Sequence, residues 1–209
     1  MARLKLRLPG KIVAVGLNYR CHAAELDMPV LAEPVLFLKP PSAVIGPGDA
    51  IRLPPQSRQV DYEGELAVVI GKTARNVGAA AADYVLGYTC ANDVTARDLQ
   101  QKDGQWTRSK SFDTFCPLGP WMETAAPPPE TRVELALNGE LRQGAPISDM
   151  VFSPLELVAY ITSVMTLERG DVILTGTPPG VGRLRAGDNV AVSIAGIGKL
   201  ENTVSRAGS

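Results

Sequence analysis

The stretch that decides the fold is DYEGELAVVI, residues 61–70, in which alternating acids run directly into an apolar segment. In an extended strand, residues i and i+2 share a face at about 7 Å separation, so Glu63 and Glu65 are expected to point the same way. Two carboxylates on one face raise each other's pKa unless a positive charge lies between them. A hard divalent cation such as Mg²⁺ or Mn²⁺ resolves that repulsion. The alternative is an exposed strand face on which both acids are solvated.

A third acid, Asp93, lies just beyond the apolar run Val85–Ala91. Thr95-Ala96-Arg97-Asp98 follows as a candidate capping box, so a short helix is expected to start beside Asp93. A carboxylate between a strand end and a helix start is well placed to complete a three-oxygen site with Glu63 and Glu65. An aspartate that serves only a turn or a helix cap is the common alternative. The sequence alone does not bring Asp93 to Glu63 in space.

Short strand-like runs separated by turn residues dominate the chain. They are Lys11–Val15, Val35–Leu38, Leu66–Ile70, Val85–Thr89, Val133–Leu137, Val172–Leu174 and Val190–Ile194. Gly-Asp pairs at 48–49, 170–171 and 187–188 are typical of tight turns that lead into strands, and Asn138-Gly139 predicts a two-residue hairpin. The pattern predicts a mainly β fold built on a rolled, mixed but largely antiparallel sheet rather than a doubly wound parallel one.

Helices are expected to be few and short. Ser153-Pro154-Leu155-Glu156 combines a capping serine, a proline at the first helical position and a glutamate that reaches back. A helix is therefore expected from there to about Met165. Ala79–Ala82 is expected to add one helical turn.

The composition is that of an ordinary globular protein and excludes several classes. The chain has 209 residues and a formal net charge of -1. It therefore lacks the basic character of a nucleic-acid-binding protein. We find neither a membrane-spanning apolar run nor the pattern of a secretory signal. Three widely spaced cysteines, Cys21, Cys90 and Cys116, favour a reducing cytoplasm over a disulfide framework. We expect one catalytic domain over residues 1–209, with a short N-terminal arm at 1–10.

Seven stretches, taken together and in order, resemble the fumarylacetoacetate hydrolase family, and in particular its small acylpyruvase-like members. They are GLNYRCHAAE (16–25), EPVLFLKPPSAV (33–44), DYEGELAVVIG (61–71), YTCANDVTARDLQ (88–100), WTRSKSFDTFCPLGP (106–120), LNGELRQ (137–143) and LERGDVILTGTPPGVG (167–182). The resemblance implies a β-roll domain, usually a homodimer, that binds Mg²⁺ or Mn²⁺ through Glu63, Glu65 and Asp93. The N-terminal domain of the longer family enzymes is expected to be missing from this chain.

The chemistry of the family suits these residues. A 2-oxo acid chelates a divalent ion, which stabilises the enolate formed when a neighbouring C–C bond breaks or a proton leaves. The leading hypothesis is a metal-dependent C–C bond hydrolase or decarboxylase (a lyase) of small 2-oxo or β-diketo acids, such as acylpyruvates, oxaloacetate or a fumarylacetoacetate-like acid. The alternative is a 2-hydroxyhepta-2,4-diene-1,7-dioate-type isomerase or decarboxylase of aromatic catabolism. A third hypothesis is a non-catalytic protein that binds the same ligands.

The resemblance also gives roles to four further residues. Lys110 matches the family lysine and is expected to add positive charge beside the substrate oxygens. Arg97 and Gln100, three residues apart, share one face of the short helix and are expected to position substrate, although Arg97 is equally suited to pair with a nearby acid. Thr177, in a TGTP segment that lacks the ending of a nucleotide-binding loop, is expected to hydrogen-bond substrate. A glycine-rich turn is the alternative interpretation of that segment.

His22, the single histidine of the chain, lies three residues before Glu25. On a helical turn the carboxylate reaches the imidazole, fixes its tautomer and raises its basicity, and such a histidine activates water. The matching pair in hydrolase-like family members is carried on a lid that orders over substrate. We therefore interpret residues 17–33 as a lid, with His22 and Glu25 as a catalytic dyad. A surface helix with an incidental His–Glu pair is the alternative.

Overall fold

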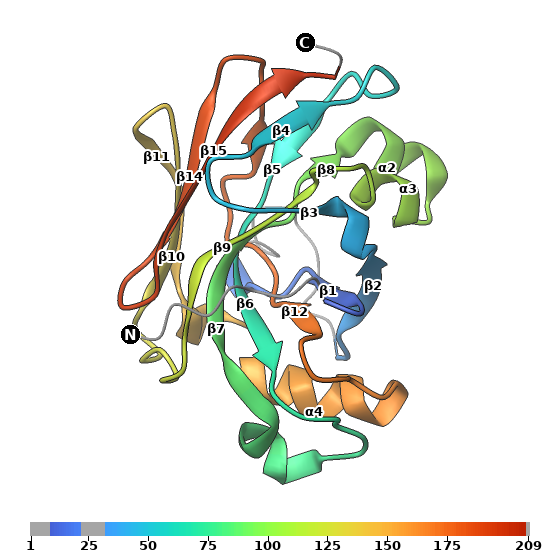
Figure 1. Ribbon diagram of the computed structural model, residues 1–209, viewed down its shortest axis with the longest axis vertical. Coiled ribbons are helices and arrows are strands. Elements are labelled where there is room, and N and C mark those ends of the chain that lie inside the picture. Colours follow the sequence, from blue (N-terminus) through green and yellow to red (C-terminus); the bar gives the residue numbers. More distant parts are fainter. Residues whose placement is uncertain (1–8, 22–31, 208–209) are drawn as a thin grey trace.

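The computed structural model describes residues 9–21 and 32–207, in which strands predominate over helices (Figure 1). The strands are β1 Ile12–Gly16, β2 Val35–Lys39, β3 Val44–Ile45, β4 Ala50–Leu53, β5 Val60–Tyr62, β6 Gly64–Ile70, β7 Val85–Asn92, β8 Thr95–Ala96, β9 Cys116–Glu123, β10 Arg132–Leu137, β11 Glu140–Pro146, β12 Val172–Leu174, β13 Gly182–Arg183, β14 Asn189–Ile194 and β15 Gly198–Arg206. The α-helices are α2 Arg97–Asp103, α3 Thr107–Lys110 and α4 Pro154–Val164, and the 3-10 turns are η1 Pro41–Ala43, η2 Gly78–Tyr84 and η3 Ile147–Asp149. The mainly β prediction is confirmed.

Three sheets make up the roll. A seven-stranded sheet has the order β2-β1-β12-β6-β7-β9-β3, a five-stranded sheet has the order β11-β10-β14-β15-β4, and β13-β5-β8 form a small third sheet. Most neighbours pair antiparallel, whereas β1 with β12, β3 with β9 and β15 with β4 pair parallel. The sheet is therefore rolled and mixed, as expected from the sequence.

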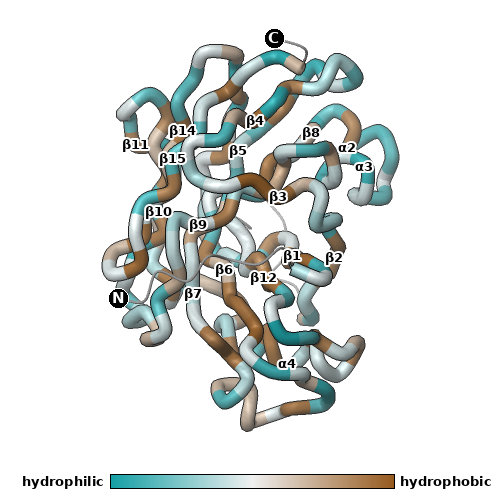
Figure 2. Tube along the Cα trace, viewed as in Figure 1, coloured by the Kyte–Doolittle hydropathy of each residue, from teal (hydrophilic) through white to brown (hydrophobic). Residues whose placement is uncertain are grey.

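Strand β6 lies at the centre of the large sheet, and both of its faces are buried. Leu66 and Val68 belong to a core cluster that also contains Val133 and Leu135 of β10, so this face packs against the five-stranded sheet. Ala67 joins a second cluster on the opposite face. Burial on both faces explains why residues 66–70 are uniformly apolar rather than alternating. In Figure 2 the tube along β6 is largely brown, whereas α2 and α3, at the upper right, carry more teal.

The turn and cap predictions are confirmed in two places. Asn138 and Gly139 both adopt positive φ, 53° and 84°, and join β10 to β11 as a tight hairpin. Ser153 and Glu156 form a complete capping box at the start of α4. In the described part of the chain, no helix is long and apolar enough to span a membrane.

The capping box expected at Thr95 is wrong. Thr95 and Ala96 form β8, which pairs with β5, and α2 begins at Arg97 without a side-chain cap. The Arg97 N–H donates to the Gln59 carbonyl at 2.8 Å, so the neighbouring chain satisfies a backbone group that a cap would otherwise serve. This pairing holds the start of α2 beside the acids at the β5–β6 junction.

Candidate active site

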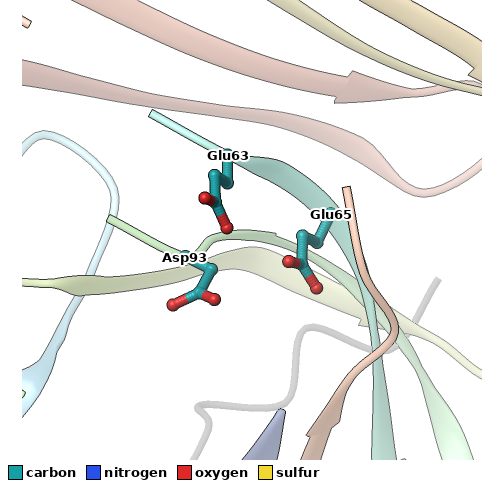
Figure 3. A group of neighbouring side chains, drawn as sticks. All are labelled: Glu63, Glu65 and Asp93. Atoms are coloured by element: carbon teal, nitrogen blue, oxygen red, sulfur yellow. The ribbon is translucent and has the colours of Figure 1, made fainter. Parts of the chain in front are cut away.

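The three acids meet because of the register between β6 and β7. These strands pair antiparallel with Gly64 opposite Asn92, and the Asp93 N–H donates to the Glu63 carbonyl at 2.8 Å. Asp93 therefore lies directly across from Glu63, and Glu65 follows on the same face of β6. Figure 3 shows the three carboxylates pointing into one space. One oxygen from each acid lies within 4.8 Å of the others, and all three residues are buried.

Two buried lysines bind these carboxylates. Lys110 Nζ lies 2.8 Å from Glu63 Oε2 and 2.6 Å from Asp93 Oδ2. Lys39, the last residue of β2, donates from Nζ to Asp93 Oδ1 at 2.6 Å. Lys39 was not among the residues predicted from the sequence, where its signal is a single lysine that ends an apolar strand directly before two prolines.

Burial and charge act on these groups in opposite directions. Burial alone would raise the pKa of Glu63, but Lys110 and Arg97 lower the pKa to about 2. Burial, together with the negative charges of Asp93 and Glu63, holds the pKa of Glu65 well above its ordinary value. Burial would lower the pKa of Lys110, yet Asp93 and Glu63 raise it overall, so Lys110 stays cationic.

The residues present fit a hard divalent cation. The donor set is entirely carboxylate, which suits Mg²⁺ or Mn²⁺. The Glu65 carboxylate accepts a hydrogen bond from the Gly176 N–H at 2.6 Å and faces the repulsion of the other two acids. A cation among the three oxygens would relieve that repulsion.

A cavity of about 220 Å³ opens over the acids. It is lined by Val15, Gly16, Leu17, Phe37, Glu63, Glu65, Asp93, Arg97, Gln100, Trp106, Lys110 and Thr177. The cavity therefore gathers the predicted metal ligands, Lys110 and all three of the predicted substrate-binding residues. Its aromatic members, Phe37 and Trp106, were not among the predicted site residues, although the stretch between Gln100 and Lys110, which contains Trp106, was expected to line the distal end of the substrate.

Residues 11–205 match the model of the fumarylacetoacetate (FAA) hydrolase C-terminal domain. The chain belongs to the fumarylacetoacetate hydrolase family. Its structure is similar to 5-carboxymethyl-2-hydroxymuconate delta-isomerase from Mycobacterium smegmatis, with a TM-score of 0.90 and 49% identity over 97% of this chain and 81% of that one. It is also similar to 2-hydroxyhepta-2,4-diene-1,7-dioate isomerase from Mycobacterium marinum, with a TM-score of 0.89 and 48% identity over 97% and 77% of the two chains. The mitochondrial oxaloacetate tautomerase Fahd2a of Rattus norvegicus is 43% identical over 94% of this chain and 66% of its own length.

In this fumarylacetoacetate hydrolase family member, Arg97 connects the acids to Gln100. Its Nε lies 3.0 Å from Asp61 Oδ2, its Nη2 donates to Glu63 Oε1, and its Nη1 donates to Gln100 Oε1 at 2.6 Å. A guanidinium only donates, so the Gln100 atom that it contacts is the carbonyl oxygen. This contact uses the oxygen of the Gln100 amide and not its NH₂ group, and Gln100 lines the cavity.

Thr177 has a structural role at the cavity wall. Its hydroxyl donates to the Gly64 carbonyl at 2.9 Å and accepts from Gln143 Nε2 at 2.8 Å. Gln143, buried and not selected from the sequence, also accepts from the Gly64 N–H at 2.9 Å and donates to the Pro178 carbonyl at 2.6 Å. Together they fix the backbone between Glu63 and Glu65. A hydrogen bond from Thr177 to substrate stays a prediction.

The predicted dyad lies outside the described residues. His22 and Glu25 both fall within 22–31, so their catalytic role and the lid over 17–33 stay predictions. The described start of that segment is anchored, because Asn18 Nδ2 donates to the Thr175 carbonyl at 2.7 Å and to the Phe152 carbonyl at 2.9 Å. This attaches the residues before His22 to the TGTP loop.

Proposed function

We propose that this protein is a divalent-cation-dependent enzyme that interconverts the keto and enol forms of small 2-oxo dicarboxylic acids such as oxaloacetate. The observation that carries the proposal is the buried cluster of Glu63, Glu65 and Asp93 under a cavity of about 220 Å³. The tautomerase and isomerase names of the similar proteins support it, because both reactions pass through an enol or enolate of a 2-oxo acid.

The chain's own residues supply binding, charge and orientation. Glu63, Glu65 and Asp93 would hold Mg²⁺ or Mn²⁺, which supplies Lewis-acid polarisation of the substrate's carboxylate and keto oxygens when bound. Lys110 keeps a fixed positive charge at the edge of the cavity, where it favours negative charge that develops on the substrate oxygens. Gln100, oriented by Arg97, offers its amide protons to a substrate carboxylate.

A second candidate is hydrolysis or decarboxylation of acylpyruvates, oxaloacetate or a fumarylacetoacetate-like acid at the same site. Cleavage of the neighbouring C–C bond uses the same enolate, and hydrolysis also needs an activated water. The sequence offers His22 and Glu25 for that step. An isomerase or decarboxylase of 2-hydroxyhepta-2,4-diene-1,7-dioate in aromatic catabolism would use the metal and lysine without the dyad.

The test is a panel of 2-oxo and β-diketo acids assayed with Mg²⁺, with Mn²⁺ and with a chelator. Enol formation is followed by ultraviolet absorbance, exchange of the C3 hydrogens by NMR, and cleavage by product analysis. We expect metal-dependent enolisation that is lost in Glu65→Gln and kept in Glu140→Gln, whose side chain is 71% exposed. Enolisation at the wild-type rate in chelator, or none with any acid, would overturn the proposal.

We further propose that the enzyme is a cytoplasmic homodimer. The family resemblance supports the dimer, and the small number and wide spacing of the three cysteines in the sequence support a reducing compartment. Light scattering tests the first point: a mass near twice 22.2 kDa is expected, and a mass near 22.2 kDa would contradict it. Localisation of the tagged full-length protein tests the second.

A further inference from the structure

The cavity over the acids is small and partly aromatic. Its volume of about 220 Å³ lies below the roughly 300–1,000 Å³ of pockets that take drug-sized ligands. Charged and amide side chains line the part of the cavity where the proposed reaction takes place. The rest of the space that a ligand can occupy is bounded by apolar side chains, of which Phe37 and Trp106 are the largest.

Phe37 holds the Trp106 ring in place. The two ring centroids lie 5.2 Å apart with planes inclined at 71°, an edge-to-face contact. Lys110 Nζ lies 4.9 Å from the centroid of the Phe37 ring, and the same ammonium binds Glu63 and Asp93. The aromatic pair therefore stands directly beside the charged cluster rather than at a distant rim.

The backbone of Gly16 supports Trp106 from another direction. A Cβ placed on Gly16 would lie 2.6 Å from Cζ3 and 2.8 Å from Cη2 of Trp106, closer than van der Waals contact allows. The last residue of β1 therefore lies flat against the outer edge of the indole. The ring has no room to retreat towards β1, so a ligand cannot enlarge the cavity by pushing the ring in that direction.

We propose that Trp106, held by Phe37 and Gly16, is the specificity-determining wall of this site. It limits the substrate to 2-oxo acids with a short substituent beyond the enolising carbon, such as four-carbon dicarboxylates, and excludes acylpyruvates with long or bulky acyl groups. This inference rests on the proposed function, since it names the substrate class of the same site.

The experiment compares wild type with Trp106→Leu on oxaloacetate and on acylpyruvates of increasing acyl size, all with Mg²⁺. We expect kcat/KM for the bulky acids to rise about tenfold or more relative to kcat/KM for oxaloacetate, the range that missing methylene groups in a pocket produce. Oxalate, which has no group beyond its chelating oxygens, is the control ligand. Its Mg²⁺-dependent binding, measured by calorimetry, should be the same in both proteins.

A second pair of variants, Gly16→Ala alone and combined with Trp106→Phe, tests the role of Trp106 while an aromatic ring is kept at position 106. Gly16→Ala pushes the indole into the cavity and should lower kcat/KM more for larger acids than for oxaloacetate. Trp106→Phe removes the outer ring atoms that the new methyl group meets, so the double variant should recover most of the loss. This pair also decides the question if Trp106→Leu does not fold.

The outcomes separate the two proposals. If Trp106→Leu binds oxalate normally but keeps the wild-type selectivity, Trp106 does not determine specificity. The same conclusion follows if the double variant recovers no activity. Either result leaves the proposed metal-dependent function intact. Failure of the wild-type protein to bind oxalate with Mg²⁺ overturns the proposed function, and the wall with it.

Discussion

Lys39 Nζ lies 2.6 Å from Asp93 Oδ1, and the two side chains are 0% and 1% exposed. Lys110 occupies the other oxygen of the same carboxylate at 2.6 Å. Asp93 is therefore fixed by a cation on each oxygen, one from edge strand β2 and one from α3. This arrangement ties the edge of the large sheet to the centre of the site.

Replacing Lys39 by Met should destabilise the metal-free protein. Removing one partner of a buried ion pair typically costs about 3–5 kcal/mol, and we expect the lower end because Lys110 still binds Asp93. Urea unfolding followed by circular dichroism measures the change. Lys199→Met is the matched control, because its pair with Glu201 is more than half exposed and such pairs contribute about 0–1 kcal/mol. Equal losses in both variants would mean that the buried pair contributes no more than a surface pair.

The fold could be predicted from the sequence where local chemistry determines the backbone. The Asn138-Gly139 hairpin and the Ser153 capping box need only a few neighbouring residues, and both form as expected. The capping box predicted at Thr95 was wrong because strand pairing with β5 overrides the local preference of Thr95 for a helix cap. That pairing depends on residues more than thirty positions away, so a local pattern does not contain it.

The site residues also fall into those that local spacing predicts and those that only the tertiary structure brings together. Glu63 and Glu65 could be placed on one face from their spacing alone. Their approach to Asp93 depends on the register of β6 with β7, and the position of Lys39 depends on the order of strands in the sheet. Asp93 was a candidate third ligand from its place at a strand end, but only the family resemblance placed it beside Glu63 and assigned a role to Lys110. The resemblance did not bring in Lys39 or Gln143.

Replacing Glu65 by Gln should weaken metal binding and stabilise the metal-free protein. The variant loses one carboxylate donor, and changes even to outer-shell groups lower metal affinity about 10–100-fold. Without metal, the same change removes the charge that burial, Asp93 and Glu63 oppose. Thermal unfolding with and without MgCl₂ should show a higher Tm than wild type in chelator and a much smaller rise on adding Mg²⁺. A Mg²⁺-induced shift equal to that of wild type would exclude Glu65 as a ligand.

Replacing His22 by Ala should separate hydrolysis from enolisation. If His22 activates water, its loss should lower the hydrolysis of an acylpyruvate by about 10²–10⁴-fold. Exchange of the C3 hydrogens of the same acid into D₂O should continue, because the charges of Lys110 and the carboxylate cluster are unchanged. Glu25→Gln should reproduce the pattern in weaker form. Equal loss of both reactions would contradict this division of labour.

Replacing Gln143 by Ala should lower both the stability of the protein and its affinity for Mg²⁺. Gln143 accepts from the Gly64 N–H and donates to Thr177 Oγ1 and the Pro178 carbonyl, so truncation leaves buried partners unpaired at about 1–3 kcal/mol each. We expect the free energy of unfolding to fall by about 3 kcal/mol, with Gln101→Ala, on the exposed side of α2, as a nearly neutral control. Because Gly64 separates Glu63 from Glu65, Mg²⁺ affinity measured by calorimetry should fall as well. A stability loss with unchanged affinity would show that Gln143 supports the sheet without positioning the carboxylates.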